Sequence, residues 1–479
     1  DLVFVIARSQ SGSYSFAGSV NFGQRPFSYL PTDYKSLSSQ NLPDPSILLP
    51  NNHFDTLLYT GNDGTQSITG LEFQPDWVWI KCRSDSSGHQ LYDSVRGATK
   101  RIYSSAQDAE STVSNGLTAF NSNGFSIGSH SGVNINSETY VGWNWNGGDT
   151  DGKTYTVTVV DSGGNKFRFD GFAANAVTLD LAEGGTYIFN YPSAHPFRFS
   201  TTADGTHGGG SEYTTGVTVL SSTSVQIVVA ASAPQLHYFC TIHSGMGGAI
   251  NTNSTLGSSN FDGSTQSRVK VNATAGFSLV SYTGTGSTTT VGHGLGVKPD
   301  FMIFRNRNGA GDDWLVYHQR LGATKNLKLN KNDPEATASN KFNDTEPTST
   351  VFTVSTAADT NQSSQNFISY IFTEIEGYSK FGFYRANSNN DGPFAYCGFR
   401  PAFVLIKRRT SGDNNPWIGY NNVRNPFNQV NNQMVWNTTE WENIDANNCN
   451  LDFLSNGFKL RNSEGSFNSN GGIYIFLAF

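Results

Sequence analysis

The feature that most constrains this chain is a pattern that recurs three times along its 479 residues. The segment FQPDWVWIK at 73–81 returns as VKPDFMIFR at 297–305 and as FRPAFVLIK at 399–407. Each copy then continues through a Tyr-containing stretch and closes with an apolar run: ETYVGWNW, NFISYIF and GGIYIFLAF. A register held through whole copies indicates a tandem repeat of one structural unit.

Each copy predicts a compact β-sandwich. A proline followed by aromatic and β-branched residues is typical of the start of a strand, where the missing N–H costs least. The run after each proline is apolar enough to be buried on both faces of a sheet. We therefore predict related sandwiches at 51–148, 276–377 and 378–479, with a linker at 251–275.

Composition supports an all-β fold and excludes several functions. The chain has 50 glycines, 13% aromatic residues and only 14% charged residues, which favours many short strands separated by turns. A net charge of −7 provides no basic surface for nucleic acid, and no apolar run approaches the roughly 20 residues of a membrane helix. Four widely spaced cysteines indicate reduced thiols and not a disulfide framework.

The sequence motifs of the copies, among them YTG turns, LYDSVRGATK and NSNGF, resemble those of repeated β-modules. Such modules occur in tail fibres and appendages of phages that infect marine bacteria and cyanobacteria. The segment VNFGQRPFSYLP resembles the closing strand of a concanavalin-like (SPRY-type) sandwich. Residues 1–50 are thus expected to hold the C-terminal part of such a sandwich and the stiff connector LPDPSILLP. The resemblance implies a virion structural protein.

Residues 151–250 differ from the three copies in their sequence pattern and contain YFCTIHSGMGG at 238–248. Cys240, His243 and Met246 lie three residues apart, and His195 follows an apolar stretch upstream. This arrangement resembles that of cupredoxins, small Greek-key sandwiches with a strand-end histidine and a C-x-x-H-x-x-M loop. The resemblance implies a copper site with His195 and His243 as imidazole ligands, Cys240 as the thiolate and Met246 as the axial sulfur, a donor set that suits both oxidation states of copper.

One residue departs from the cupredoxin pattern. Pro196 follows the first histidine and has no N–H with which to brace the cysteine loop, so the surroundings of the ligands must differ. The ligand set could also be structural or vestigial in a domain recruited as a rigid module. His237 and His207 are expected at the surface. Three residues are candidates to shield the site: Phe197, Phe239 and Ile242.

The function favoured by the sequence is non-enzymatic. The chain has no G-x-S-x-G, H-E-x-x-H or P-loop pattern, and we predict no catalytic residues. We expect a virion appendage protein for host-surface attachment or fibre assembly, a homotrimer that contacts other virion proteins and a host-surface glycan or protein. The alternatives are a copper-binding protein carried on structural repeats and a glycan-active appendage enzyme. The sequence does not indicate which residues bind a partner.

Overall fold

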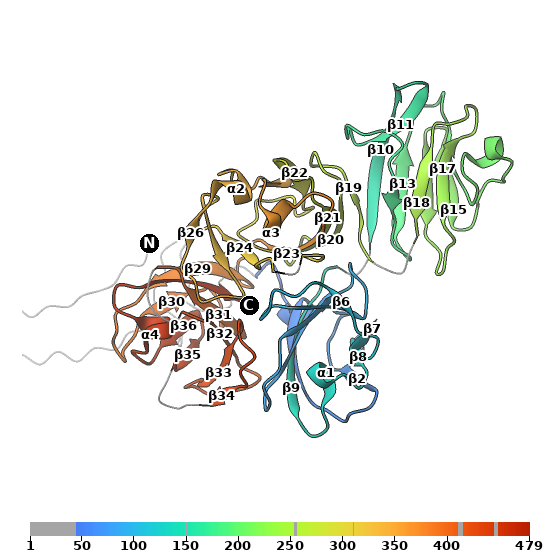
Figure 1. The fold of residues 1–479 in the computed structure, drawn as a ribbon. Coiled ribbons are helices and arrows are strands. Elements are labelled where there is room, and N and C mark those ends of the chain that lie inside the picture. The colour runs from blue at the N-terminus through green and yellow to red at the C-terminus, as the bar shows by residue number, and fades with distance from the viewer. Residues whose placement is uncertain (1–44, 149–150, 253–255, 310, 411–414, 445–448) are drawn as a thin grey trace, which may run out of the picture.

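The computed structural model describes residues 45–148, 151–252, 256–309, 311–410, 415–444 and 449–479, and short strands dominate all of them (Figure 1). The α-helices in these ranges are single turns of four residues: α1 (Ser131–Asn134), α2 (Ser339–Phe342), α3 (Ala358–Asn361) and α4 (Gly465–Asn468). The prediction of an all-β chain of tandem sandwiches is confirmed. The concanavalin-like strand expected near the N-terminus lies outside the described residues.

The first copy consists of two facing sheets. Its main sheet has the order β1–β9–β3–β4–β5–β6, and its small sheet the order β2–β8–β7. The strands are β1 (Phe54–Thr60), β2 (Gln66–Thr69), β3 (Trp77–Cys82), β4 (Gln90–Asp93), β5 (Lys100–Tyr103), β6 (Ser111–Thr112), β7 (Leu117–Asn121), β8 (Gly124–Ile127) and β9 (Thr139–Trp145).

The second and third copies repeat this order. The second has β21–β28–β23–β24–β25–β26 with the small sheet β22–β27, and the third has β29–β37–β31–β32–β33–β34 with β30–β36–β35. In the second copy the strands are β21 (Phe277–Thr283), β22 (Thr289–Gly292), β23 (Phe301–Asn306), β24 (Leu315–His318), β25 (Lys325–Lys328), β26 (Ala336–Thr337), β27 (Val351–Val354) and β28 (Asn366–Phe372). In the third they are β29 (Lys380–Arg385), β30 (Phe394–Tyr396), β31 (Phe403–Arg408), β32 (Trp417–Asn421), β33 (Asn432–Val435), β34 (Asn443–Ile444), β35 (Leu451–Leu454), β36 (Gly457–Leu460) and β37 (Ile473–Ala478).

The repeated prolines occupy one position in all three copies. Pro75, Pro299 and Pro401 each lie two residues before the central strand, β3, β23 or β31. The residue after each proline donates the next backbone bond to the neighbouring strand: Asp76 to Trp145 (2.8 Å), Asp300 to Phe372 (2.8 Å) and Ala402 to Phe479 (2.7 Å). The ring that lacks an N–H therefore lies just outside the ladder, where no bond is lost.

The main sheets of the three copies face one another and share one aromatic core. Rings stack or tilt across every boundary between copies: Trp77 on Tyr370 (centroids 4.1 Å apart), Trp79 on Trp436 (4.1 Å) and Phe301 on Phe381 (5.7 Å). A separate apolar core fills each copy between its main and small sheets. Each central strand is therefore buried on both faces, which explains why it shows no polar alternation.

A buried lysine or arginine at the same position of each central strand reaches the neighbouring copy. Lys81, Arg305 and Lys407 are fully buried, and each donates to a backbone carbonyl of another copy. The acceptors are Thr439 of the third copy, Asp108 of the first and Asn332 of the second, respectively. The first copy thus donates to the third, the third to the second and the second to the first, so the contacts close into a ring.

Ion pairs follow the same ring two residues further along. Arg83 pairs with Glu442, Arg307 with Glu110 and Arg409 with Glu335. The backbone N–H of each glutamate also donates to the carbonyl of its arginine, at 2.9, 2.7 and 2.8 Å. Because two kinds of contact repeat at equivalent positions, the three copies are related by approximate threefold symmetry within one chain. We call this set of contacts the inter-copy ring.

The segment 251–275, expected to be a linker, instead extends the main sheet of the second copy. It carries β19 (Ser258–Asn260) and β20 (Ser267–Asn272), and β20 pairs with β21 along its whole length. The sheet of the second copy therefore has eight strands. The alternation of polar and apolar residues in SRVKVN is the sequence signal that the linker interpretation missed.

Residues 151–252, here called the inserted domain, form a separate two-sheet sandwich. Its sheets have the orders β11–β10–β13–β16–β15 and β12–β18–β17–β14. The strands are β10 (Gly152–Asp161), β11 (Asn165–Phe169), β12 (Leu179–Asp180), β13 (Thr186–Asn190), β14 (Phe197–Ser200), β15 (Val217–Ser221), β16 (Ser224–Val228), β17 (Leu236–Cys240) and β18 (Gly248–Asn251). Figure 1 shows the domain projecting from the three copies.

The inserted domain is joined to the second copy by β19. The Tyr155 hydroxyl donates to the carbonyl of Ser259 at 2.8 Å, and the Asp180 N–H donates to the Ser259 hydroxyl at 2.8 Å. Phe261, which follows β19, is buried in the core of the inserted domain. The two parts therefore share both hydrogen bonds and apolar contacts.

All four cysteines of the chain are free and buried, in agreement with the interpretation as thiols. Two lie in the third copy, one in the first and one in the inserted domain. No helix in the described ranges is long and apolar enough to cross a membrane.

Candidate metal centre

Strand pairing brings His195 to the cysteine loop. In the pairing of β14 with β17, Phe197 lies opposite Cys240, so His195 comes just before the partner of the cysteine. A turn closed by the bond from the His195 N–H to the Pro192 carbonyl (2.9 Å) positions the histidine after β13. Cys240 is the last residue of β17, and His243 lies three residues further on, in the turn that follows the strand. Two segments far apart in the sequence thus supply one cluster.

The three donor atoms converge. The Cys240 sulfur lies 3.6 Å from His243 Nδ1 and 4.0 Å from His195 Nδ1, and all three atoms lie within 4.8 Å of one another. Bonds of about 2.0 Å to nitrogen and 2.3 Å to sulfur, 120° apart, would separate N and S by about 3.7 Å. The two distances from sulfur to nitrogen are therefore close to those of a mononuclear metal site with N₂S ligation.

Burial divides the predicted ligands into an inner and an outer pair. Cys240 and Met246 are fully buried in the apolar core of the inserted domain, whereas His195 is half-buried and His243 exposed. The Met246 carbonyl accepts from the Phe167 N–H at 3.0 Å, which fixes the loop against β11. A thiol and a thioether buried in one core, with two imidazoles that are more exposed, are donor types that suit copper.

The shielding of the site differs in part from expectation. Phe197 and Phe239 are fully buried, as predicted, but the Ile242 side chain is 58% exposed. Ile242 lies in the turn after β17, beyond the last residue that pairs with β14, so it is not held against the sandwich. The site is therefore covered from the core side, while its outer side is open.

The cysteine loop is braced by groups that the sequence did not suggest. The carbonyl of Pro196 accepts from the Thr241 N–H at 3.1 Å, so this proline acts through its oxygen. His207, expected to be solvent-exposed, is exposed but donates from Nε2 to the Cys240 carbonyl at 3.0 Å. The Asp204 carboxylate accepts from the Gly245 N–H at 2.8 Å.

Gly205 explains how the loop that carries Asp204 and His207 reaches the site. A Cβ at Gly205 would lie 2.5 Å from the Phe239 ring, and its φ of +57° disfavours other residues. A DGTHGGG stretch therefore reads as a flexible loop in the sequence but packs tightly in the structure. His237, expected at the surface, is half-buried on β17.

Electrostatics favour the neutral imidazole at His195. Burial lowers the pKa of His195, and the neighbouring His243 lowers it further. Neutral imidazole is the form that binds a metal.

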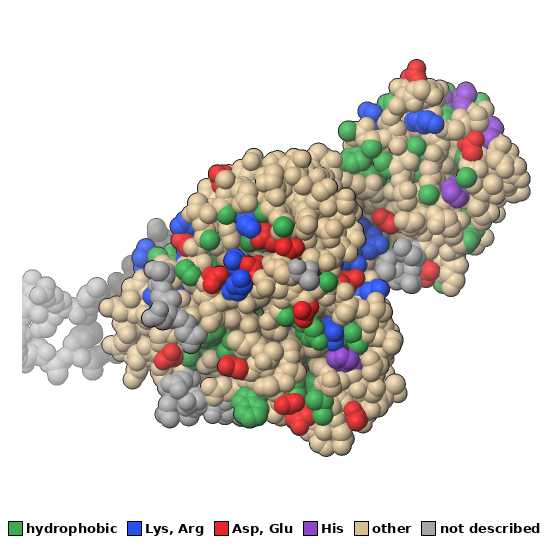
Figure 2. All heavy atoms as spheres, in the orientation of Figure 1, with side chains coloured by type: hydrophobic (Ala, Val, Ile, Leu, Met, Phe, Trp, Pro, Cys, Tyr) green, Lys and Arg blue, Asp and Glu red, His purple; other side chains and the backbone are tan. Residues whose placement is uncertain are grey.

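Most of the histidines visible in Figure 2 lie on the inserted domain. Because β13 runs parallel to β10, which begins at the connection to the first copy, the end of β13 that leads to His195 points away from that connection.

Comparison with known families finds one match. The family described as a domain of unknown function, DUF7483, matches residues 49–186 and 251–479. The chain belongs to this family. The DUF7483 match includes all three copies and is interrupted at 187–250, the part of the inserted domain that holds the four predicted ligands. No curated protein and no solved structure matches the chain.

Proposed function

We propose that the chain is a non-enzymatic structural protein of a virion appendage, which attaches to a host surface or joins parts of a fibre. The observation that supports this proposal is the inter-copy ring. Three modules that share one aromatic core and are joined by buried, directional bonds form a rigid body. A load-bearing or attachment protein needs a large surface that keeps its shape. None of the described contacts of the inter-copy ring points to a catalytic role.

The position of the inserted domain fits the same role. It projects from the ring in Figure 1 and is held by β19, so its outer end is presented at a fixed place. The ring already uses the faces through which separate modules would associate. A homotrimer of whole chains would therefore have to form through other surfaces. Light scattering of the purified chain measures whether it is a monomer or a trimer.

Localisation on particles tests the structural role. Antibodies against the inserted domain should label an appendage of purified particles in electron micrographs and reduce adsorption to host cells. Antibodies against an unrelated virion protein serve as the control for steric effects. Absence of the chain from purified particles, with its presence in infected cells, would contradict the proposal.

We propose, as a second candidate function, that the inserted domain binds one copper ion in a cupredoxin-like site. The observation that favours it is the convergence of His195, Cys240 and His243 within 4.8 Å, with Met246 buried in the same core as Cys240. His195 and His243 would supply imidazole nitrogens, Cys240 the thiolate and Met246 a weak axial sulfur. Copper in such a set supports one-electron transfer, or it can add to folding stability where no redox partner exists.

Copper reconstitution tests this candidate. The purified chain, incubated with Cu(II) and desalted, should retain one copper per chain and show a thiolate-to-copper absorption band. Cys240→Ser should lose both, and Cys82→Ser, which alters another buried thiol in the first copy, should keep both. A chain that retains no copper, or a Cys240→Ser variant that retains it unchanged, would refute the copper site.

A further inference from the structure

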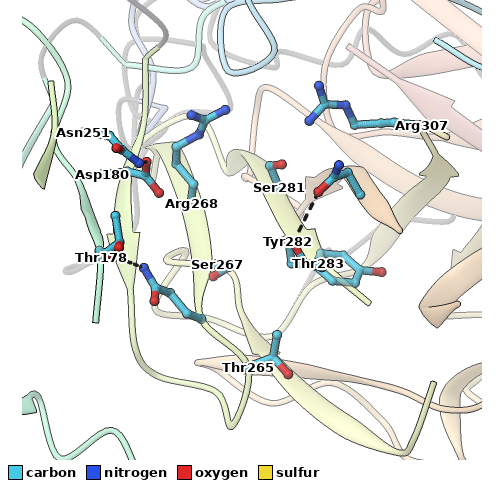
Figure 3. Close-up of a pocket in the computed structure, with 12 residues that line it drawn as sticks. Thr178, Asp180, Asn251, Thr265, Ser267, Arg268, Ser281, Tyr282, Thr283 and Arg307 are labelled. Atoms are coloured by element: carbon cyan, nitrogen blue, oxygen red, sulfur yellow. Dashed lines mark hydrogen bonds between the residues drawn. The ribbon is translucent and has the colours of Figure 1, made fainter. Parts of the chain in front are cut away.

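A polar cleft separates the inserted domain from the second copy. Its volume is about 500 Å³, within the range of roughly 300 to 1,000 Å³ of small-molecule sites. Figure 3 shows side chains of the inserted domain on one side and of the second copy on the other. The lining residues are Thr178, Asp180, Asn251, Thr265, Gln266, Ser267, Arg268, Ser281, Tyr282, Thr283, Arg307 and Asn366.

The two walls are held at a fixed separation. The Gln266 amide donates to the carbonyl of Thr178 at 2.9 Å and to the Ser259 hydroxyl at 3.0 Å. Together with the bonds of β19, these contacts join the edge of the inserted domain to the edge of the second copy. The floor is a regular sheet surface, since β20, β21 and β28 are neighbours in the eight-stranded sheet. The cleft is therefore a built feature of the fold.

The chemistry of the lining selects the ligand. Most ligand pockets are largely apolar with a few polar groups, whereas this cleft presents mainly hydroxyl, amide, carboxylate and guanidinium groups. Asp180 only accepts hydrogen bonds, and Arg268 and Arg307 only donate them. An apolar ligand would displace water from this polar lining without replacing its hydrogen bonds, which costs free energy. A phosphate or sulfate would lie beside the Asp180 carboxylate, and like charges at such a distance repel.

A saccharide matches such a lining, because each of its hydroxyls both donates and accepts. The Asn251 amide donates to Asp180 at 3.0 Å and leaves the second carboxylate oxygen for a ligand hydroxyl. Arg307 uses Nε and Nη2 for Glu110, at 2.8 and 2.9 Å. Among the described residues, neither its Nη1 nor the Ser281 hydroxyl has a hydrogen-bond partner. We propose that this cleft binds a saccharide unit of a surface glycan.

This inference deepens the attachment role proposed above and rests on it only for the source of the glycan. The cleft itself depends on the inserted domain, which supplies one wall.

The end of β1 in the first copy is equivalent to the end of β21, with Thr60 in the place of Thr283, and both threonines are exposed. The inserted domain faces Thr283 across the cleft, so the chain offers its own matched controls.

The test is a glycan array probed with the labelled full-length chain, followed by calorimetric titration with a bound saccharide. Thr283→Trp should fill the cleft and reduce affinity at least tenfold, while Thr60→Trp should bind as the original chain does. Arg307→Gln and Arg83→Gln both remove an ion pair of the inter-copy ring. Both should lower the melting temperature to a similar extent, but only Arg307→Gln should reduce saccharide binding.

Three outcomes separate this inference from the proposed function. No binding to any saccharide on the array, or equal binding by the Thr283→Trp and Thr60→Trp variants, would overturn the cleft even if the chain is found on particles. Binding by a chain that is absent from particles would support the cleft and overturn the virion role. Release of reducing sugar from the bound glycan would support the cleft and overturn the non-enzymatic role.

Discussion

Trp314 of the second copy donates from its indole N–H to the Tyr103 carbonyl of the first copy at 2.7 Å. The same contact recurs at the two other boundaries, from Trp417 to Lys328 (2.9 Å) and from His89 to Val435 (3.0 Å). The three donors directly precede or begin equivalent strands, and the three acceptors end equivalent strands. This third set of contacts follows the direction of the inter-copy ring, and a histidine replaces tryptophan in the first copy.

Removal of one such donor should destabilise the chain without altering its fold. Trp417→Phe keeps an aromatic ring in the shared core but loses the bond to the Lys328 carbonyl. We expect the free energy of unfolding to fall by about 1 to 2 kcal/mol, from the lost hydrogen bond and the reduced packing. Denaturant titration followed by tryptophan fluorescence measures this change.

Trp441→Phe is the matched control for that experiment. Trp441 lies in the same copy but is 59% exposed, so its replacement should change the free energy of unfolding by less than about 0.5 kcal/mol. Equal losses for the two variants would show that the indole bond across the boundary does not contribute to stability.

His207 should tune the copper site without being a ligand. His207→Ala removes the donor to the Cys240 carbonyl and frees the loop that carries it. If the inserted domain binds copper, loss of such a supporting contact should weaken affinity by about 10- to 100-fold with the stoichiometry unchanged. Competition with a copper chelator of known affinity measures this. His237→Ala, which alters the histidine of β17, should have no effect, and an equal effect of both variants would argue against a specific role of His207.

Stability should rise with pH because of Lys407. Burial lowers the pKa of this lysine from 10.5 to about 7, and Asp333 offsets part of the shift. Between about pH 7 and 10 the unfolded chain therefore holds a proton that the folded chain has released, so stability increases with pH in this window. From pH 7 to 9 we expect a gain on the order of 1 to 2 kcal/mol.

Lys407→Met isolates this contribution. The variant loses the titrating group but keeps an unbranched side chain in the buried position, so its stability profile between pH 7 and 9 should be flatter than that of the original chain. Denaturation curves at half-unit pH intervals provide the comparison. Parallel profiles would show that Lys407 does not titrate in this range.

Asn468 should be important for the third copy. Its side-chain amide donates to the carbonyls of Asn389 and Asn462, both at 2.9 Å, and so joins three loops. Asn134 and Asn361 make equivalent contacts at α1 and α3. Asn468→Ala removes both bonds and leaves a void at a fully buried position, and it should cost about 2 to 3 kcal/mol. Asn470→Ala, at an exposed position nearby, should be neutral in the same thermal unfolding assay.

The sequence predicted the features that depend on local pattern. The position of Pro75 and its two equivalents identified the central strands, because a missing N–H restricts where a proline can lie in a sheet. The spacing of Cys240 and His243, with His195 upstream, identified three donors that the fold does bring together.

Contacts between distant segments were not predictable in the same way. The acceptors of the inter-copy ring are backbone carbonyls, which any residue provides, so Thr439 and Asp108 have no sequence signature. His207 acts through a carbonyl as well, and Gly205, one of several glycines in its loop, did not indicate that the loop packs closely. The cleft beside Asp180 depends on where the inserted domain lies relative to the second copy, which no local pattern encodes.

In each set of contacts of the inter-copy ring, every copy supplies one donor to one neighbour and one acceptor to the other neighbour. The first copy donates through Lys81 and accepts at Asp108. Three separate polypeptides of one module each could therefore close into the same ring, but they would fall apart on dilution. Fusion into one polypeptide replaces that dependence by a local concentration set by the connecting segments. It also lets each boundary diverge alone, as the exchange of tryptophan for His89 illustrates.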